Sequence, residues 1–124
     1  MVPSSAGAVV LVRFPFSDLS GSKLRPAVAL AAAGADDWVL CQVTSNPCAD
    51  LRAVQLDEDS FAIGSLQRTS FARPGKLFTA NASPMAVESG HLTPTSFSQV
   101  LNAVIGLLRG QGAGSAVNAI GTPS

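Results

Sequence analysis

The sequence predicts a mainly β domain, a small barrel or sandwich with one helix at its C-terminal end. Three observations predict it: many short apolar runs, Gly and Pro residues between them, and a change to helical spacing after residue 93. A chain of 124 residues, 47% of them hydrophobic, can form one core but not two ordinary domains. We expect a flexible N-terminus over residues 1–6, one domain over residues 7–110 and a disordered tail over residues 111–124.

The N-terminal part of the domain predicts three consecutive strands. Residues 8–14 (AVVLVRF) are rich in β-branched residues and lie between a Gly and a Pro, which is typical of a buried strand. A polar segment, residues 15–25, follows and is too long for a tight hairpin, so we expect a loop. The apolar runs 26–33 and 37–45 are separated by three residues, a spacing that favours a hairpin.

Shorter strands are expected at residues 51–56, 76–80 and 85–92, because each of these runs is apolar and is bounded by Gly, Pro or Asn. The turn residues expected between them are Asn46, Pro47, Pro74, Gly75 and Pro84.

A single helix is predicted at the C-terminal end of the domain. Thr93 can cap it, Pro94 suits the first helical position, and Gly110 ends it. The apolar residues spaced by three and four that form one helical face are Phe97, Val100, Leu101, Val104, Ile105 and Leu108.

The charges exclude a generic polyanion-binding protein but allow a local basic groove. The formal net charge is zero. Residues 63–124 contain one carboxylate, Glu88, and their basic residues are Arg68, Arg73, Lys76 and Arg109.

We expect a cytoplasmic protein without a membrane partner. Charged residues interrupt every apolar stretch before it reaches the roughly 18 residues of a membrane span, and the first residues lack the basic start of a signal peptide. Cys41 and Cys48 form no Cys/His cluster suited to zinc, so we expect two reduced thiols and no metal or cofactor.

Arg25 begins the second predicted strand, and Thr44 ends the third. If residues 25–33 and 36–44 form an antiparallel hairpin, residue i opposes roughly residue 69 − i, which places Arg25 opposite Thr44. A guanidinium recognises phosphate or carboxylate with a planar fork of donors. A guanidinium beside a hydroxyl therefore predicts a phosphate site, with a surface ion pair of Arg25 as the alternative.

Four segments in this order resemble the MazF/PemK family of toxin endoribonucleases, over about Gly7 to Arg109. The resemblance implies an SH3-like β-barrel with a C-terminal helix, a homodimer, and metal-independent cleavage of single-stranded RNA at short sequences. It also implies neutralisation by a peptide segment of a cognate antitoxin. The segments are GAVVLVRFPFSDLSGSKLRPAVAL, VLCQVTSN, RTSFARPGKLFT and HLTPTSFSQVLNAVIGLL.

The resemblance implies that Arg25 and Thr44 are the catalytic residues. In the implied chemistry the ribose 2′-hydroxyl attacks the adjacent phosphate, and these two side chains stabilise the developing charge. His91 is the only histidine, so a two-histidine mechanism is excluded, and we expect His91 to be structural or exposed. The candidate RNA-binding residues are Phe16, Ser17, Lys23, Ser45, Asn46, Arg73 and Lys76.

For three of these candidates a structural role is the alternative: core packing for Phe16, and an ion pair for Arg73 or Lys76. The chain also departs from the family at Ala8 and Arg13, where acidic residues are usual. Two other functions stay open, a gyrase poison like the similar CcdB proteins and an inactive barrel that only binds an antitoxin. The Arg25 and Thr44 pair favours the nuclease, because a protein-binding surface has no need of it.

Overall fold

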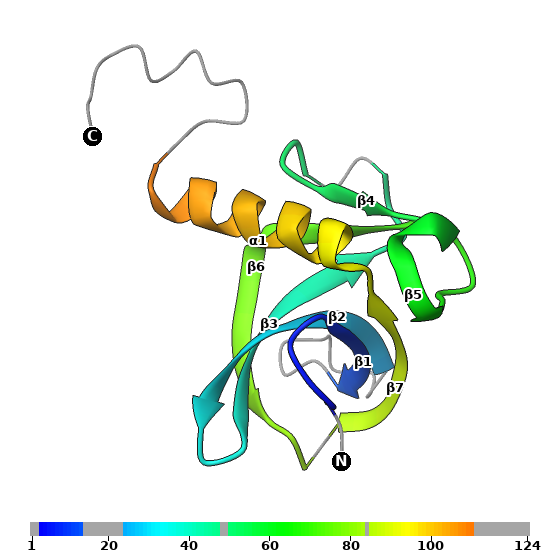
Figure 1. Cartoon of the computed structure of the whole chain (residues 1–124). Coiled ribbons are helices and arrows are strands. Elements are labelled where there is room, and N and C mark those ends of the chain that lie inside the picture. Colours follow the sequence, from blue (N-terminus) through cyan, green and yellow to red (C-terminus); the bar gives the residue numbers. More distant parts are fainter. Residues whose placement is uncertain (1–2, 14–23, 48–49, 84, 111–124) are drawn as a thin grey trace, which may run out of the picture.

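A computed structural model describes residues 3–13, 24–47, 50–83 and 85–110. It confirms the expected fold, a β-barrel with a C-terminal helix (Figure 1). Within the described residues, no helix is both long enough and apolar enough to cross a membrane. The strands are β1 (Ala8–Arg13), β2 (Leu24–Gly34), β3 (Asp37–Thr44), β4 (Val54–Leu56), β5 (Phe61–Gly64), β6 (Ser70–Asn81) and β7 (Met85–Leu92), and the helix is α1 (Pro94–Leu108).

The strands form one antiparallel sheet in the order β4-β6-β3-β2-β1-β7-β5. The sheet curls into a nearly closed barrel, and α1 lies across β6, β4 and β7 (Figure 1). The predicted hairpin between β2 and β3 is confirmed. Ala35 and Asp36 at its tip have φ values of 53° and 66°, the left-handed backbone that a tight hairpin turn requires.

Both faces of the sheet are apolar, which explains why the strands contain continuous apolar runs in place of strict alternation. In β1, Val9 packs in one cluster while Val10 and Val12 pack in another, because successive side chains point to opposite faces. The first cluster also contains Val100 and Val104 of α1. Helix α1 therefore covers one face of the sheet, and the second cluster lies on the other face.

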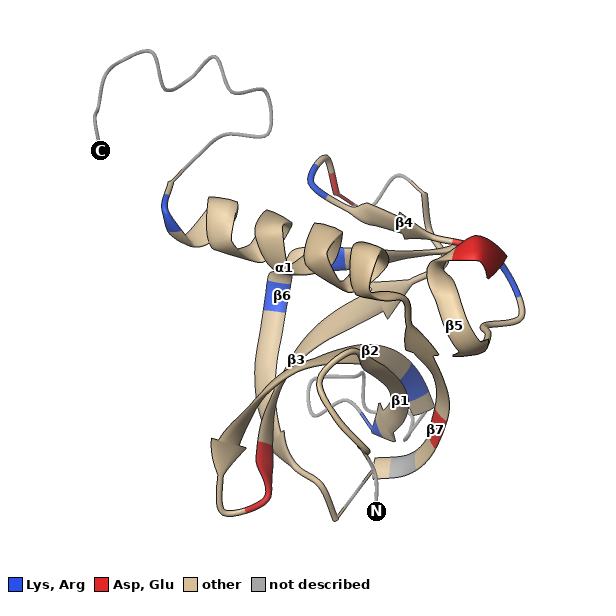
Figure 2. Ribbon diagram, viewed as in Figure 1, with Lys and Arg blue, Asp and Glu red and all other residues tan. Residues whose placement is uncertain are grey.

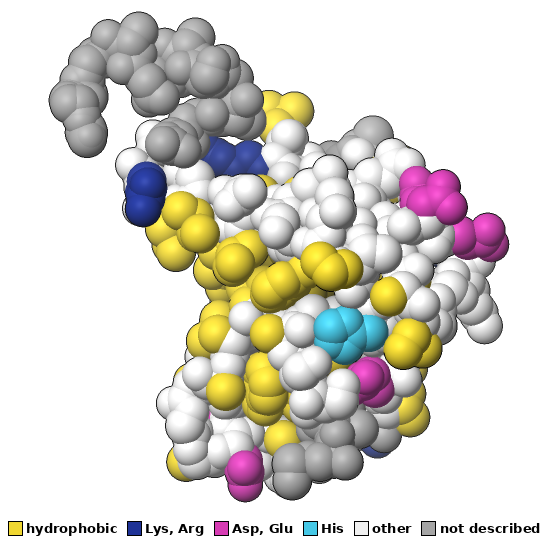
Figure 3. Space-filling view, in the orientation of Figure 1, with side chains coloured by type: hydrophobic (Ala, Val, Ile, Leu, Met, Phe, Trp, Pro, Cys, Tyr) yellow, Lys and Arg dark blue, Asp and Glu magenta, His cyan; other side chains and the backbone are white. Residues whose placement is uncertain are grey.

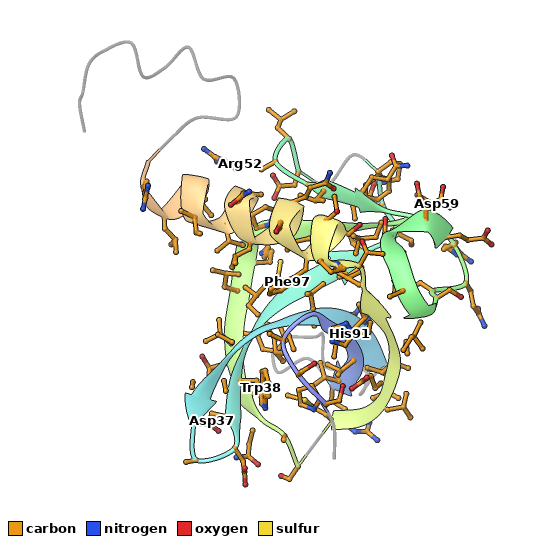
Figure 4. All side chains as sticks on the ribbon, in the orientation of Figure 1. Asp37, Trp38, Arg52, Asp59, His91 and Phe97 are labelled. Atoms are coloured by element: carbon orange, nitrogen blue, oxygen red, sulfur yellow. The ribbon has the colours of Figure 1, made fainter. Side chains whose placement is uncertain are left out.

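Helix α1 begins and ends as predicted. The Thr93 hydroxyl accepts a hydrogen bond from the Ser96 N–H at 3.1 Å, and Gly110 follows the last turn with a φ of +79°. Phe97 extends from α1 toward the barrel (Figure 4). The predicted apolar face is buried only in part, since Leu108 near its C-terminal end is 70% exposed.

The turn predicted at Pro74 and Gly75 is wrong, because both residues lie inside the long strand β6. The Pro-Gly pair instead lies at a β-bulge. Cys41 of β3 pairs with Leu77 and Val43 with Ala72, so four residues of β6 oppose Gln42 alone. Pro74 is tolerated there because some residues of a bulge are unpaired, so a residue without an N–H breaks no ladder hydrogen bond.

The edge strands were predicted least well. Strand β4 is shorter than the predicted run 51–56, and β5 was not predicted at all. A 3-10 turn, Glu58–Ser60, precedes β5, and its cap residue Asp57 accepts a hydrogen bond from the Asp59 N–H at 3.0 Å. Strand β7 has the predicted bounds, whereas the predicted turn residue Pro84 lies outside the described residues.

Candidate active site

A cavity of about 600 Å³ opens between β2 and β3, beyond the point where the two strands stop pairing. We call it the Arg25 cavity. Its walls come from β1, β2, the end of β3 with Ser45 after it, the start of β6, β7 and the loop between β5 and β6. Its lining residues are Leu11, Leu24, Arg25, Pro26, Val43, Thr44, Ser45, Ser65, Leu66, Gln67, Arg68, Ser70 and Ser89.

The predicted hairpin register is confirmed for the middle of the strands, where Ala27 pairs with Gln42 and Ala29 with Leu40. The pairing ends there. Arg25 pairs with Val12 of β1, and Thr44 pairs with Phe71 of β6. The two residues are therefore not a cross-strand pair, but both line the Arg25 cavity, each positioned by a different neighbouring strand.

The Thr44 hydroxyl is held in place by its own turn. Its Oγ1 accepts a hydrogen bond from the Asn46 N–H at 3.1 Å. This short turn fixes the side chain where β3 ends, and the hydroxyl hydrogen remains available to donate to a ligand.

Arg25 is exposed at the start of β2, and it makes no ion pair with any described residue. None of the described residues that line the cavity is Asp or Glu. A guanidinium and a hydroxyl donor in a cavity without carboxylates favour an anion, and a phosphate accepts hydrogen bonds from both.

The other predicted RNA-binding residues lie in different places. Ser45 lines the Arg25 cavity, whereas Asn46, Arg73 and Lys76 do not. Arg73 and Lys76 lie in the β6 bulge, where a Cβ atom on Gly75 would lie 3.8 Å from Leu107 of α1. Arg73 Nε is 4.0 Å from Asp50 Oδ2. Phe16, Ser17 and Lys23 lie outside the described residues.

Five polar residues that line the cavity were not predicted from the sequence: Ser65, Gln67, Arg68, Ser70 and Ser89. The first three belong to the loop between β5 and β6. The polar run SLQRTS and the excess of cations in the second half of the chain were the available signals.

A second cavity, of about 400 Å³, adjoins the first and shares Leu66, Gln67 and Arg68 with it. We call it the acidic cavity, because Asp57, Glu58 and Asp59 of the 3-10 turn line it. Figure 2 shows this turn in red beside β5. The two adjoining cavities thus have opposite charge.

His91 has a structural role and does not line either cavity. Its Nδ1 lies 3.1 Å from the Leu92 carbonyl oxygen and therefore donates to it, and its Nε2 accepts from the Ser5 hydroxyl at 2.8 Å. The ring, which Figures 3 and 4 show, packs over Gly7, where a Cβ atom would lie 2.9 Å from the imidazole.

Cys41 is buried in the core, and burial raises the pKa of its thiol from 9.0 to about 12. The Sγ–H donates to the Arg73 carbonyl oxygen at 3.1 Å, a hydrogen bond that only the protonated thiol can make. The thiol is therefore inert at neutral pH. Among the described residues, no group of three or more His, Cys, Asp or Glu side chains could hold a metal ion.

Solved structures of toxin endoribonucleases share this architecture at low sequence identity. A MazE–MazF complex from Deinococcus radiodurans is 20% identical, with a TM-score of 0.66, and the match covers 87% of this chain and 96% of that one. An endoribonuclease from a Mycobacterial species, in complex with its cognate antitoxin, is 15% identical, with a TM-score of 0.63 and coverage of 89% and 96%. The Mycobacterium tuberculosis toxin MazF-mt6 is 13% identical, with a TM-score of 0.64 and coverage of 82% and 96%.

The sequence itself matches no family model and no curated protein. At identities of 13% to 20%, the structural similarity establishes the architecture and not the activity. This chain therefore has the fold of the MazF toxin endoribonucleases.

Proposed function

We propose that this protein is the toxin of a toxin-antitoxin pair, an endoribonuclease that cleaves single-stranded messenger RNA in the cytoplasm and so inhibits growth. One observation supports the proposal above all others: Arg25 and Thr44, on strands β2 and β3 of a MazF fold, line one cavity that has no described carboxylate. A surface ion pair of Arg25, the alternative, has no partner among the described residues.

The proposed reaction takes its nucleophile from the RNA. The ribose 2′-oxygen attacks the adjacent phosphorus, and the bond from phosphorus to the 5′-oxygen breaks. The products are a 2′,3′-cyclic phosphate and a 5′-hydroxyl. The 2′ proton passes to water, and the leaving 5′-oxygen takes up a proton from water, so the step balances.

In this reaction Arg25 and Thr44 stabilise the negative charge that develops on the phosphate oxygens. Arg25 supplies two parallel N–H donors, and the Thr44 hydroxyl supplies one more. A preorganised donor of this kind typically contributes about 3 to 4 kcal/mol to catalysis. We propose that the reaction needs no metal, since neither the nucleophile nor this charge stabilisation requires one.

We also propose two protein partners, a cognate antitoxin and a second copy of the chain. Two of the similar structures are complexes with an antitoxin or with MazE. Exposed apolar side chains near the C-terminal end of α1 support the homodimer, since Ile105 and Leu108 are 37% and 70% exposed. Hydrophobic side chains gather in a band below α1 (Figure 3).

Incubation of the purified protein with a long RNA in excess EDTA tests the proposed activity. We expect discrete fragments that carry 2′,3′-cyclic phosphate ends, and we expect Arg25→Ala to produce few of them. Intact RNA together with inhibited supercoiling by DNA gyrase contradicts the proposal and supports a gyrase poison. RNA that is cut only when magnesium is added contradicts the metal-independent mechanism.

A further inference from the structure

A second guanidinium lines the Arg25 cavity. Arg68, in the loop between β5 and β6, is exposed like Arg25, and it makes no ion pair with any described residue. Two such arginines on one cavity exceed what a single phosphate requires, because one planar fork already satisfies two phosphate oxygens.

The loop that carries Arg68 is fixed at both ends. Gly64 ends β5 with a φ of +69°, and a Cβ atom there would collide with the Ser89 carbonyl oxygen of β7. At the other end, the buried Ser70 hydroxyl donates to the Arg68 carbonyl oxygen at 3.0 Å. The backbone of Arg68 therefore has a defined position on the cavity wall.

The adjoining acidic cavity restricts where a polyanion can run. Arg68 lines both cavities, so it lies at the boundary between a surface with two arginines and one with three carboxylates. Phosphates are attracted to the first surface and repelled by the second. A strand that leaves Arg25 therefore meets Arg68 before it meets Asp57, Glu58 and Asp59.

We propose that Arg68 is a substrate-positioning residue that binds a second phosphate of the RNA, next to the phosphate that Arg25 contacts. This inference rests on the proposed nuclease function. Arg68 binds the strand equally in the ground state and the transition state, so it lowers KM and leaves kcat unchanged.

The test compares Arg68→Ala with the wild type in two assays. In RNA cleavage we expect KM to rise about tenfold with kcat unchanged. In binding we use a short fluorescein-labelled single-stranded DNA, which lacks the attacking 2′-hydroxyl and cannot be cut. The association constant falls as salt rises, and the magnitude of the slope of its logarithm against log salt should be smaller by about 0.7 in the variant. This is the change expected when one phosphate contact to a single strand is removed.

Two further variants separate a phosphate contact from a general effect of charge. Arg68→Lys should restore most of the salt slope, because a point charge still binds a phosphate. Arg109→Ala removes the same charge at the C-terminal cap of α1, outside both cavities, and should change neither KM nor the slope.

If Arg68→Ala behaves like Arg109→Ala while the wild type cleaves RNA, the inference is wrong and the proposed function stands. A fall in kcat at constant KM also overturns it, since that result assigns Arg68 to the transition state. If the wild type neither cuts RNA nor binds the DNA, the proposed function fails and this inference fails with it.

Discussion

Arg25 and Thr44 line one cavity although they do not pair with each other in the sheet. Strands β2 and β3 stop pairing at Ala27 and Gln42, and each strand continues along a different neighbour. If the ladder continued, the two residues would be direct cross-strand neighbours with Cβ atoms about 5 Å apart. The end of pairing leaves room for a ligand that both side chains can reach.

Replacement of Arg25 by Ala should reduce RNA cleavage by about 10² to 10³-fold, because the variant loses the donors that stabilise the developing charge. Arg25→Lys should recover little of this activity, since an ammonium group cannot form two parallel hydrogen bonds. Single-turnover cleavage of the same RNA measures both. Full cleavage by a folded Arg25→Ala protein would show that Arg25 is only a surface cation.

Thr44→Val keeps the shape of the side chain and removes the hydroxyl. We expect cleavage to fall by about 10²-fold if that hydroxyl donates to the developing charge. The double variant Arg25→Ala, Thr44→Val should lose much less than the product of the two single losses, because groups that act on one phosphate are not additive. Multiplicative losses would place the two side chains on different phosphates.

The architecture could be predicted from sequence where local signals and packing agree. The cap at Thr93, the proline at position 94 and the apolar spacing define α1, and the same residues perform those roles in the structure. The end of the β2–β3 pairing could not be predicted, because it depends on how β1 and β6 pair with the two strands.

Two features depend on contacts between distant segments, so local sequence signals did not identify them. The position of Arg68 on the cavity wall depends on the loop between β5 and β6, and the short run FAIG of β5 has no pattern that marks it as a strand. The bulge at Pro74 resembles a turn in sequence, and only the register of β3 against β6 shows that the strand continues.

Gly64→Ala should destabilise the protein and weaken RNA cleavage together. The substitution places a side chain at a φ of +69° and against the Ser89 carbonyl oxygen, so the loop that carries Arg68 must move. Gly34→Ala is the matched control, since its φ is +96° but a Cβ atom there meets nothing within 4 Å. The control should lose about 1 to 2 kcal/mol in urea unfolding and keep its activity. Equal losses in both variants would show that the contact with Ser89 has no effect.

The exposed end of α1 should be part of the homodimer interface. Leu108→Asp puts a charge where a partner would otherwise bury a leucine, so we expect the dimer to dissociate. Sedimentation equilibrium of the wild type should give twice the monomer mass of 12.6 kDa, and the variant should give the monomer mass. A wild-type monomer at micromolar concentration would rule out the proposed dimer.

Alkaline solution should destabilise the protein through Cys41. Its pKa rises from 9.0 to about 12 on folding, so between these values the unfolded chain loses the thiol proton while the folded protein keeps it. The free energy of unfolding should therefore be unaffected by this thiol below pH 9. Above pH 9 it should fall by about 1.4 kcal/mol per pH unit until about pH 12.

Cys41→Ala tests this dependence, because it removes the titrating group at the cost of a small cavity. The variant should be less stable than the wild type at pH 7, but its stability should decline less steeply between pH 9 and pH 11. The chain contains no Tyr, so no phenol titrates in this range. Parallel declines in the two proteins would show that the Cys41 thiol keeps an ordinary pKa in the folded state.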